Sequence, residues 1–173
     1  MDEHEPIRVG EAYVGDVPAD AAHINVVLGS RQVLGVAWTT VLGGPGRGNI
    51  PFVAVLKPNV PVRPLTLFVN KAAIESDRHA NITWGAAQAG VALGMSDAVA
   101  EGLIPIARAD ELIALAAVWV SPAADDEEQV FRNNRRATHE AVANALAGRP
   151  TAEETLTSRD DCHNPFFDPR PLL

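Results

Sequence analysis

The sequence contains little cysteine, few aromatic residues and fewer basic than acidic side chains. Cys162 is the single cysteine among 173 residues, so an internal disulfide is excluded and a reducing compartment is favoured. Aromatic residues make up 5% of the chain, which leaves Ala, Val, Leu and Ile to build the core. The formal net charge of −8 argues against nucleic acid and anionic membrane surfaces as partners, because both attract Lys and Arg.

No segment has the character of a membrane span or a secretory signal. The apolar stretches fall short of the about 20 residues that cross a bilayer, and residues 1–10 lack a basic region followed by an apolar run. We therefore expect a cytoplasmic protein that does not bind membranes. With 47% hydrophobic and 21% charged residues, the chain is typical of a globular protein. A single domain is expected over residues 1–173, with an extended tail from about residue 149.

Five segments have the β-branched or alternating character of strands. Residues 7–15 and 22–29 are joined by a short turn, which predicts an antiparallel hairpin. Residues 52–58 and 65–74 are two more strands on either side of a proline-rich, extended linker. Residues 112–122 are the last strand in the chain.

Three helices are expected between and after these strands. The first covers residues 30–44, the second runs from Ser76 towards Glu101, and the third covers residues 123–148, with acidic residues in its first turn. The second helix is rich in small residues, which predicts close packing against another backbone. The order ββαββαβα indicates an α+β fold with helices on one side of a mixed, mostly antiparallel sheet.

Several motifs that would carry chemistry are incomplete. The glycine-rich loop at residues 43–51 lacks the Lys-Ser/Thr pair of a phosphate-binding loop, so it is interpreted as a flexible connection. Asp125–Glu128 lie where acids stabilise the start of a helix. Cys162-His163 has no second pair of ligands, so no metal is expected. His79 and His139 fall on helices among polar neighbours and are interpreted as solvated.

Three polar side chains remain in apolar company, namely His23, Lys71 and Gln88. His23 and Asn25 are two residues apart in a predicted strand, so they share one face. Each of the three has an ordinary structural interpretation: a histidine on a solvated strand face, a lysine at a strand edge and a glutamine on an exposed helix face. Taken one at a time, these interpretations are favoured over a functional one.

Together with longer stretches, these residues form a recognisable pattern. The segments "VGEAYVGD", "AHIN", "NK" at 70–71, "GAAQAGVALGMSDAVAEGLIP" at 85–105 and "HNPFF" resemble the formaldehyde-activating enzymes of tetrahydromethanopterin-linked one-carbon metabolism. The resemblance runs from about residue 8 to residue 167. It implies a fold like the second domain of ribosomal protein S5. It also implies a ring-shaped homopentamer that binds the pterin between subunits, with tetrahydromethanopterin as co-substrate and no metal.

The resemblance also implies roles for individual residues. His23 matches the family histidine that is the proposed general acid. Lys71 and Gln88 match residues that contact the pterin, and Val53 falls at the position of a pterin-contacting leucine.

Three positions depart from the family pattern. Asn25 replaces an aspartate and Ala73 replaces a threonine, and both are pterin-contacting positions in the family. Ala86 replaces a proline that precedes the glutamine motif. An asparagine amide offers one acceptor and two donors where a carboxylate only accepts, so the ligand that fits here can differ.

In the family reaction an amine of the reduced pterin attacks formaldehyde, water leaves, and a second amine closes the ring. Loss of water needs a proton on the departing hydroxyl, which a histidine with a pKa of about 6.5 can supply. The matches at His23, Lys71 and Gln88 favour this activity, in formaldehyde detoxification and one-carbon metabolism. Asn25 and Ala73 favour the alternative, a non-catalytic or re-purposed paralogue that binds a different pterin-like or one-carbon ligand. A purely structural role is the least favoured interpretation.

Overall fold

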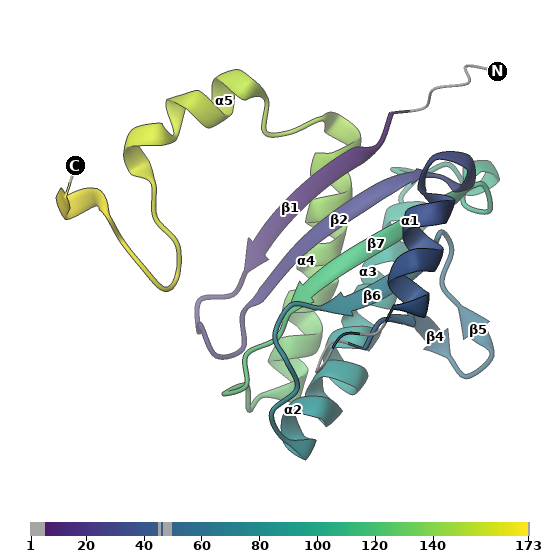
Figure 1. Cartoon of the computed structure of the whole chain (residues 1–173), viewed down its shortest axis with the longest axis horizontal. Coiled ribbons are helices and arrows are strands. Elements are labelled where there is room, and N and C mark those ends of the chain that lie inside the picture. The colour runs from purple at the N-terminus through teal and green to yellow at the C-terminus, as the bar shows by residue number, and fades with distance from the viewer. Residues whose placement is uncertain (1–5, 45, 47–49, 173) are drawn as a thin grey trace.

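One five-stranded sheet forms the centre of the computed structural model, which describes residues 6–44, 46 and 50–172 (Figure 1). Its strands are β1 (Arg8–Val14), β2 (Ala22–Ser30), β3 (Phe52–Val53), β6 (Leu65–Asn70) and β7 (Leu112–Trp119). They lie in the order β1-β2-β7-β6-β3, where β6 and β7 run parallel and the other neighbours antiparallel. A separate ribbon contains β4 (Val55–Lys57) and β5 (Val60–Pro61).

Helices alternate with these strands as the sequence predicts. The α-helices are α1 (Arg31–Gly43), α2 (Asp77–Ile82), α3 (Gln88–Ala100), α4 (Glu127–Ala147) and α5 (Ala152–Thr157), and the π-helical turn η1 (Thr83–Ala87) joins α2 to α3. Single 3₁₀ turns are η2 (Ile106–Arg108), η3 (Arg159–Asp161) and η4 (Arg170–Leu172). The expected α+β class and the mixed, mostly antiparallel sheet are confirmed, and the tail beyond α4 carries an exposed helix.

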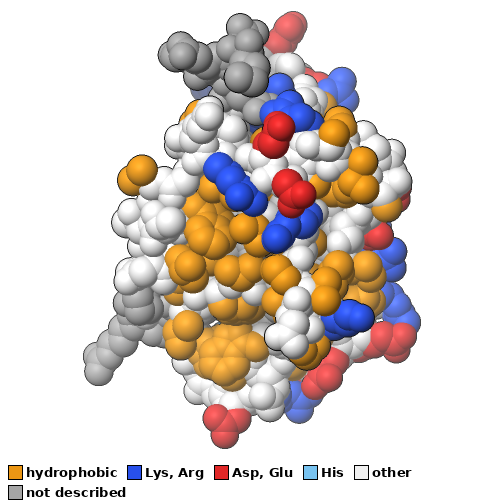
Figure 2. Space-filling view, turned by 90° about the vertical axis from the view of Figure 1, so that its right-hand side faces the viewer, with side chains coloured by type: hydrophobic (Ala, Val, Ile, Leu, Met, Phe, Trp, Pro, Cys, Tyr) orange, Lys and Arg blue, Asp and Glu red, His pale blue; other side chains and the backbone are white. Residues whose placement is uncertain are grey.

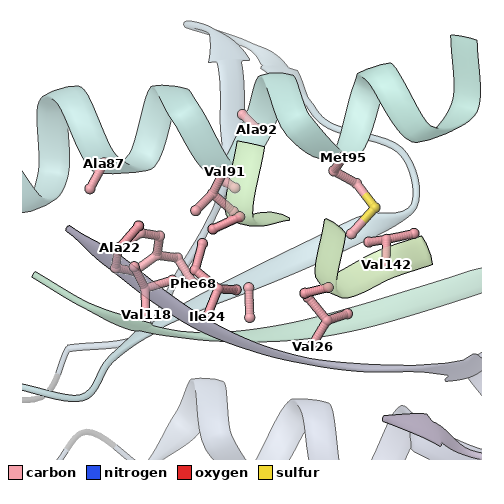
Figure 3. Close-up of a cluster of buried hydrophobic side chains, with 14 of the residues drawn as sticks. Ala22, Ile24, Val26, Phe68, Ala87, Val91, Ala92, Met95, Val118 and Val142 are labelled. Carbon is pink, nitrogen blue, oxygen red and sulfur yellow. The ribbon is translucent and has the colours of Figure 1, made fainter. Parts of the chain in front are cut away.

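Alternation along β2 decides which side chains enter the core. Ile24 and Val26 are fully buried on the side covered by α3 and α4, together with apolar side chains of both helices (Figure 3). His23 and Asn25 occupy the alternate positions, and they lie half-buried on the opposite face. The buried side of the strand therefore fixes which residues can reach a ligand.

One helix departs from the expected arrangement on a single face of the sheet. α1 lies across the face opposite α4 (Figure 1). A Cβ added at Gly29 would lie 3.1 Å from Leu34 of α1, and Trp38 Nε1 donates to the carbonyl of Ala114 at 3.2 Å. No linker residues separate β2 from α1, because Ser30 is both the last residue of β2 and the N-cap of α1. The helix therefore packs on the face of the sheet that the chain meets directly at the end of β2.

Close packing of α3 on α4 confirms the expectation drawn from its small residues. A Cβ added at Gly94 would lie 2.3 Å from the carbonyl oxygen of Arg135, and one at Gly90 would lie 2.6 Å from that of Phe131. No side chain fits at these distances, so glycine lets the two helix backbones touch. The third glycine of the segment, Gly85, has open space around its Cβ direction and makes no such contact.

Element boundaries differ from the sequence expectations at a few points. The strand expected over residues 65–74 ends at Asn70, whose side-chain amide donates to the Ala72 carbonyl at 2.7 Å and closes a turn. Lys71 therefore follows the strand. Residues 52–58 split into β3 and β4, and the helix expected from Ser76 contains the π-helical turn η1.

The expectation that His79 is solvated is wrong. Its side chain is 2% exposed, and Nε2 lies 3.0 Å from the carbonyl oxygen of Val120 at the end of β7. The first turn of α2 points the ring inward, where this carbonyl gives it a polar partner. His139 remains near the surface and pairs with Glu101 at 2.8 Å.

The connections contain two further features. The flexible connection predicted at residues 43–51 includes residues 45 and 47–49, which lie outside the described part of the chain. In the tail, Phe166 returns to pack edge-on against Trp119, with 5.4 Å between the ring centroids.

Among the described helices, none is both long and apolar enough to cross a membrane.

We expect Gly94→Ala to destabilise the protein by roughly 1–3 kcal/mol, because the added methyl overlaps the α4 backbone. Gly35→Ala is the matched control, since Gly35 lies in α1 with nothing within 4 Å of its Cβ direction. That variant should gain about 0.5–1 kcal/mol from helix propensity. Urea unfolding at one protein concentration measures both, and a neutral Gly94→Ala would contradict the close-packing account.

Candidate functional site

Two groups of side chains combine polar chemistry with accessibility. The imidazole–amine cluster consists of Glu11, His23, Asn25 and Lys71 on the sheet face opposite α4. The edge pocket lies beside β3, at the sheet edge, and encloses about 320 Å³. Its lining residues are Ile50, Phe52, Val53, Val55, Trp84 and Gln88.

Strand pairing positions the acidic and imidazole groups of the cluster. In the β1–β2 hairpin Glu11 is opposite Asn25, and Tyr13 is opposite His23. Glu11 and His23 are therefore diagonal neighbours on one face, within reach of long side chains. His23 Nε2 lies 2.8 Å from Glu11 Oε1, and because a carboxylate can only accept, the imidazole donates this hydrogen bond.

Lys71 reaches the cluster from the end of β6. Its backbone N–H donates to the carbonyl of Val118 at 2.7 Å, which fixes the chain as it leaves the sheet. From there Nζ donates to Asn25 Oδ1 at 2.8 Å, across the edge of the intervening strand β7. One hairpin and one strand end thus bring the three predicted residues His23, Asn25 and Lys71 together.

The surroundings shift the pKa values of both basic groups downward. Desolvation lowers the pKa of His23 below its ordinary 6.5, and the charge of Lys71 lowers it further, against the raising effect of Glu11. Desolvation also lowers the pKa of Lys71 from 10.5 to about 8, again against Glu11. Both groups therefore release a proton more readily than they would in water.

The edge pocket is apolar apart from one amide. Phe52 stacks on Phe68 of the core at a centroid distance of 4.9 Å, and Trp84, which also lines the pocket, is 43% exposed. Gln88 is buried, and its Oε1 accepts from the backbone N–H of Val55 at 2.6 Å. The expected exposed-face interpretation of Gln88 is therefore wrong, because its side chain ties α3 to β4.

The structure places five of the six predicted site residues in these two groups. Val53 and Gln88 line the edge pocket, while Ala73 is exposed in the segment after β6. One contact connects the two regions: the backbone N–H of Ile50, in the pocket wall, donates to Asn70 Oδ1 at 3.2 Å, directly before Lys71 in the chain.

Glu11 and the pocket residues Ile50, Phe52, Val55 and Trp84 were missed in the sequence interpretation. Glu11 could have been found from the predicted hairpin, because its register places this carboxylate beside His23. Trp84 gives no comparable signal, since an aromatic residue on a helix usually belongs to the core. Within the described ranges, no group of three or more His, Cys, Asp or Glu side chains is arranged to hold a metal.

A family model and several known proteins match this chain over most of its length. The model of the formaldehyde-activating enzyme family matches residues 9–167. A 5,6,7,8-tetrahydromethanopterin hydro-lyase of Methanosarcina barkeri is 40% identical over 159 residues, which cover 91% of this chain and 89% of that protein. A bifunctional enzyme Fae/Hps of Archaeoglobus fulgidus is 33% identical over 92% of this chain, which spans 40% of that relative. The corresponding protein of Methanococcoides burtonii is 35% identical over 88% of this chain and 38% of its own length.

The charges of the cluster predict opposite effects of two substitutions on the pKa of His23. Lys71→Met should raise this pKa, because it removes a neighbouring cation. Glu11→Gln should lower it, because it removes the carboxylate at 2.8 Å. NMR titration of the histidine ring protons, assigned with a His23→Gln variant, measures both shifts. Lys57→Met, on β4, is the control; equal shifts in all three variants would rule out this coupling.

Proposed function

The chain belongs to the formaldehyde-activating enzyme family, and from this premise we propose that it condenses formaldehyde with a reduced pterin of the tetrahydromethanopterin type. The product is the methylene-tetrahydropterin. The 2.8 Å pairing of His23 with Glu11, next to the amine of Lys71, is the observation that carries this assignment. Such a reaction consumes free formaldehyde, so we propose a role in formaldehyde detoxification and one-carbon metabolism. The free Cys162 fits a cytoplasmic setting.

His23 is proposed as the general acid that protonates the departing hydroxyl. Glu11 orients the ring by accepting from Nε2. A pKa below 6.5 makes His23 a stronger acid than a free histidine, although a smaller fraction of it is protonated at neutral pH. A well-placed general acid accelerates a reaction by roughly 10²–10⁴-fold.

The edge pocket is proposed to receive the flat ring system of the pterin. Its volume of about 320 Å³ falls in the range of small-molecule sites. Phe52 and Trp84 offer aromatic surface, Val53 adds an aliphatic wall and Gln88 provides the polar group of the lining. These residues suit a heterocycle with a mainly apolar face.

Asn25, Lys71 and Ala73 are proposed as further ligand contacts, at the imidazole–amine cluster and the segment after β6. Because the cluster and the edge pocket occupy different parts of the sheet, we propose that the pocket of one subunit faces the cluster of the next. A pterin between subunits would then touch both groups of residues.

A homopentameric ring of single-domain subunits, each covering residues 1–173, is the assembly that we propose. Apolar side chains gather on the side of the molecule where β4 and β5 lie (Figure 2). Several large ones are substantially exposed there, and surfaces of this kind mark interfaces. They include Ile50 at 49%, Leu56 at 47%, Val60 at 37% and Trp84 at 43%.

Asn25 and Ala73 support a second candidate, a paralogue that binds another pterin-like or one-carbon ligand. The amide of Asn25 accepts from Lys71 and offers a ligand the donors that a carboxylate lacks. Ala73 offers no hydroxyl. Activity measurements with tetrahydromethanopterin distinguish the two candidates directly.

Condensation of formaldehyde with tetrahydromethanopterin should fall by roughly 10²-fold or more in His23→Ala, because the general acid is lost. The fold should persist, since the His23 side chain is 39% exposed. The spontaneous reaction is subtracted, and His139→Ala serves as the matched surface control. Unchanged activity would make His23 a structural residue, and an inert wild type would favour the paralogue.

Size-exclusion chromatography with light scattering should give a mass about five times that of the 18.4 kDa chain. Leu56→Glu should reduce this mass, because a charge placed in an apolar interface cannot keep its hydration. Circular dichroism checks that the variant is folded. A monomeric wild type at micromolar concentration would overturn both the ring and the shared pocket.

A further inference from the structure

The amine of Lys71 is bonded to a neutral partner although a carboxylate lies close by. Nζ donates to the amide oxygen of Asn25 at 2.8 Å. The carboxylate of Glu11 accepts instead from His23 Nε2, also at 2.8 Å. A hydrogen bond to a neutral amide stabilises an ammonium less than one to a carboxylate does. This arrangement therefore makes loss of the proton from Lys71 less costly than it would be beside a carboxylate.

The protonation of Lys71 agrees with this geometry. Loss of hydration lowers its pKa to about 8, and the opposing charge of Glu11 does not offset that effect. Since each pKa unit is a tenfold change in the ratio of the two forms, the neutral amine is about 300-fold more abundant near neutral pH than in a lysine that titrates at 10.5. A neutral amine is the form that adds to carbonyl compounds.

Lys71 is accessible from solvent, and His23 lies nearby as a potential acid. Lys71 is exposed as a whole, so a molecule as small as formaldehyde can reach Nζ. His23 lies two residues from Asn25 along β2, which is about 7 Å in a strand. The charge of Lys71 lowers the pKa of His23, so the two groups are close enough to interact electrostatically.

We propose that Lys71 captures formaldehyde covalently on Nζ before the carbon passes to the second substrate. This inference rests on the proposed function and adds a nucleophile to it. It makes Lys71 a catalytic residue, because its Nζ bonds to the reacting carbon.

The step balances without an oxidant or a reductant. The Nζ lone pair forms a bond to the carbonyl carbon, the C=O π electrons move to oxygen, and the proton lost from nitrogen ends on that oxygen. The product is N-hydroxymethyl lysine. His23, when protonated, gives a proton to this hydroxyl, water leaves, and an iminium forms between Nζ and the methylene carbon. An amine of the second substrate then adds to the methylene carbon and its proton passes to Nζ. The carbon–Nζ bond breaks with the electron pair remaining on Nζ, which restores the lysine amine and leaves the methylene as an iminium on the second substrate.

The chain provides its own control for a trapping experiment, because Lys57 and Lys71 are its only lysines. The intact protein is exposed to limiting ¹³C-formaldehyde with cyanoborohydride at pH 7.5, without pterin. Cyanoborohydride reduces each iminium to a stable methylamine, and peptide mass spectrometry counts the label at both residues. Lys71 should be labelled at least roughly tenfold faster than Lys57, because the lowered pKa of Lys71 enlarges its neutral fraction. Its labelling rate should level off above about pH 8.

Asn25→Asp tests the cause of this preference. A carboxylate at position 25 would pair with the ammonium and raise the pKa of Lys71, so labelling at Lys71 should fall at least several-fold while labelling at Lys57 stays constant. Constant labelling at Lys57, together with an unchanged circular dichroism spectrum, shows that the variant is folded. Equal labelling of the two lysines in the wild type would overturn the proposal, as would an unchanged preference in Asn25→Asp.

The trapping experiment tests the capture step, and the condensation assay tests the proposed function, so a negative result in one can be distinguished from a negative result in the other. A wild type that condenses formaldehyde with tetrahydromethanopterin without preferential labelling of Lys71 would overturn the capture step alone. Preferential labelling in a protein that is inert towards the pterin would support capture and overturn the proposed function. In an active enzyme, Lys71→Arg keeps a cation but removes the nucleophile, so the rate at saturating pterin should fall at least tenfold. A change confined to the KM for pterin would overturn the capture step and leave Lys71 as a binding residue.

Discussion

The register of β2 is the constraint on which the candidate site depends. This strand is paired on both sides, with β1 and with β7, and its inward residues are fully buried. A slip by one residue would place His23 and Asn25 in the core and expose Ile24 and Val26, which the burial of apolar surface strongly opposes. The hydrophobic core therefore specifies the direction of the imidazole and amide without contacting either.

The hairpin that carries this strand is fastened to α4 by polar as well as apolar contacts. Asp20, in the turn before β2, accepts from the backbone N–H groups of Asp125 and Asp126 at 3.1 and 3.2 Å. Asn133 donates to the carbonyl of Asp20 at 2.8 Å. Gly10 of β1 allows the helix backbone to approach, since a Cβ there would lie 2.0 Å from a carbonyl oxygen of α4. These contacts therefore fix the position of the hairpin that carries Glu11 and His23 relative to α4.

Local sequence patterns were sufficient to predict the five strands of the central sheet, the long helices and the polar face of β2. They also indicated that the small residues of α3 make a close contact with another backbone. Three properties depend on long-range packing and could not be read locally. These are the position of α1 on the opposite face of the sheet, the burial of His79 and the bond between Gln88 and Val55.

For the candidate site too, the residues could be identified from the sequence, whereas a property that depends on packing could not. The motifs resembling the family identified His23, Asn25 and Lys71, and the structure brings these three together. The partner carboxylate Glu11 follows from the hairpin register, which the sequence predicts. The lowered pKa of Lys71 could not be predicted, because it results from desolvation by neighbours that approach only in the folded chain.

The cluster also combines contacts that differ greatly in sequence separation. Glu11 and His23 belong to one hairpin, whereas the bond from Lys71 to Asn25 spans 46 residues and requires β6 to dock beside β7. Local hairpins close early in folding, and parallel pairing across a long connection closes late. A chain in which only the hairpin has formed can thus hold the hydrogen bond between His23 and Glu11 while it lacks the amine. The complete electrostatic environment of His23 is consequently a property of the finished sheet, and it requires the parallel pairing of β6 with β7.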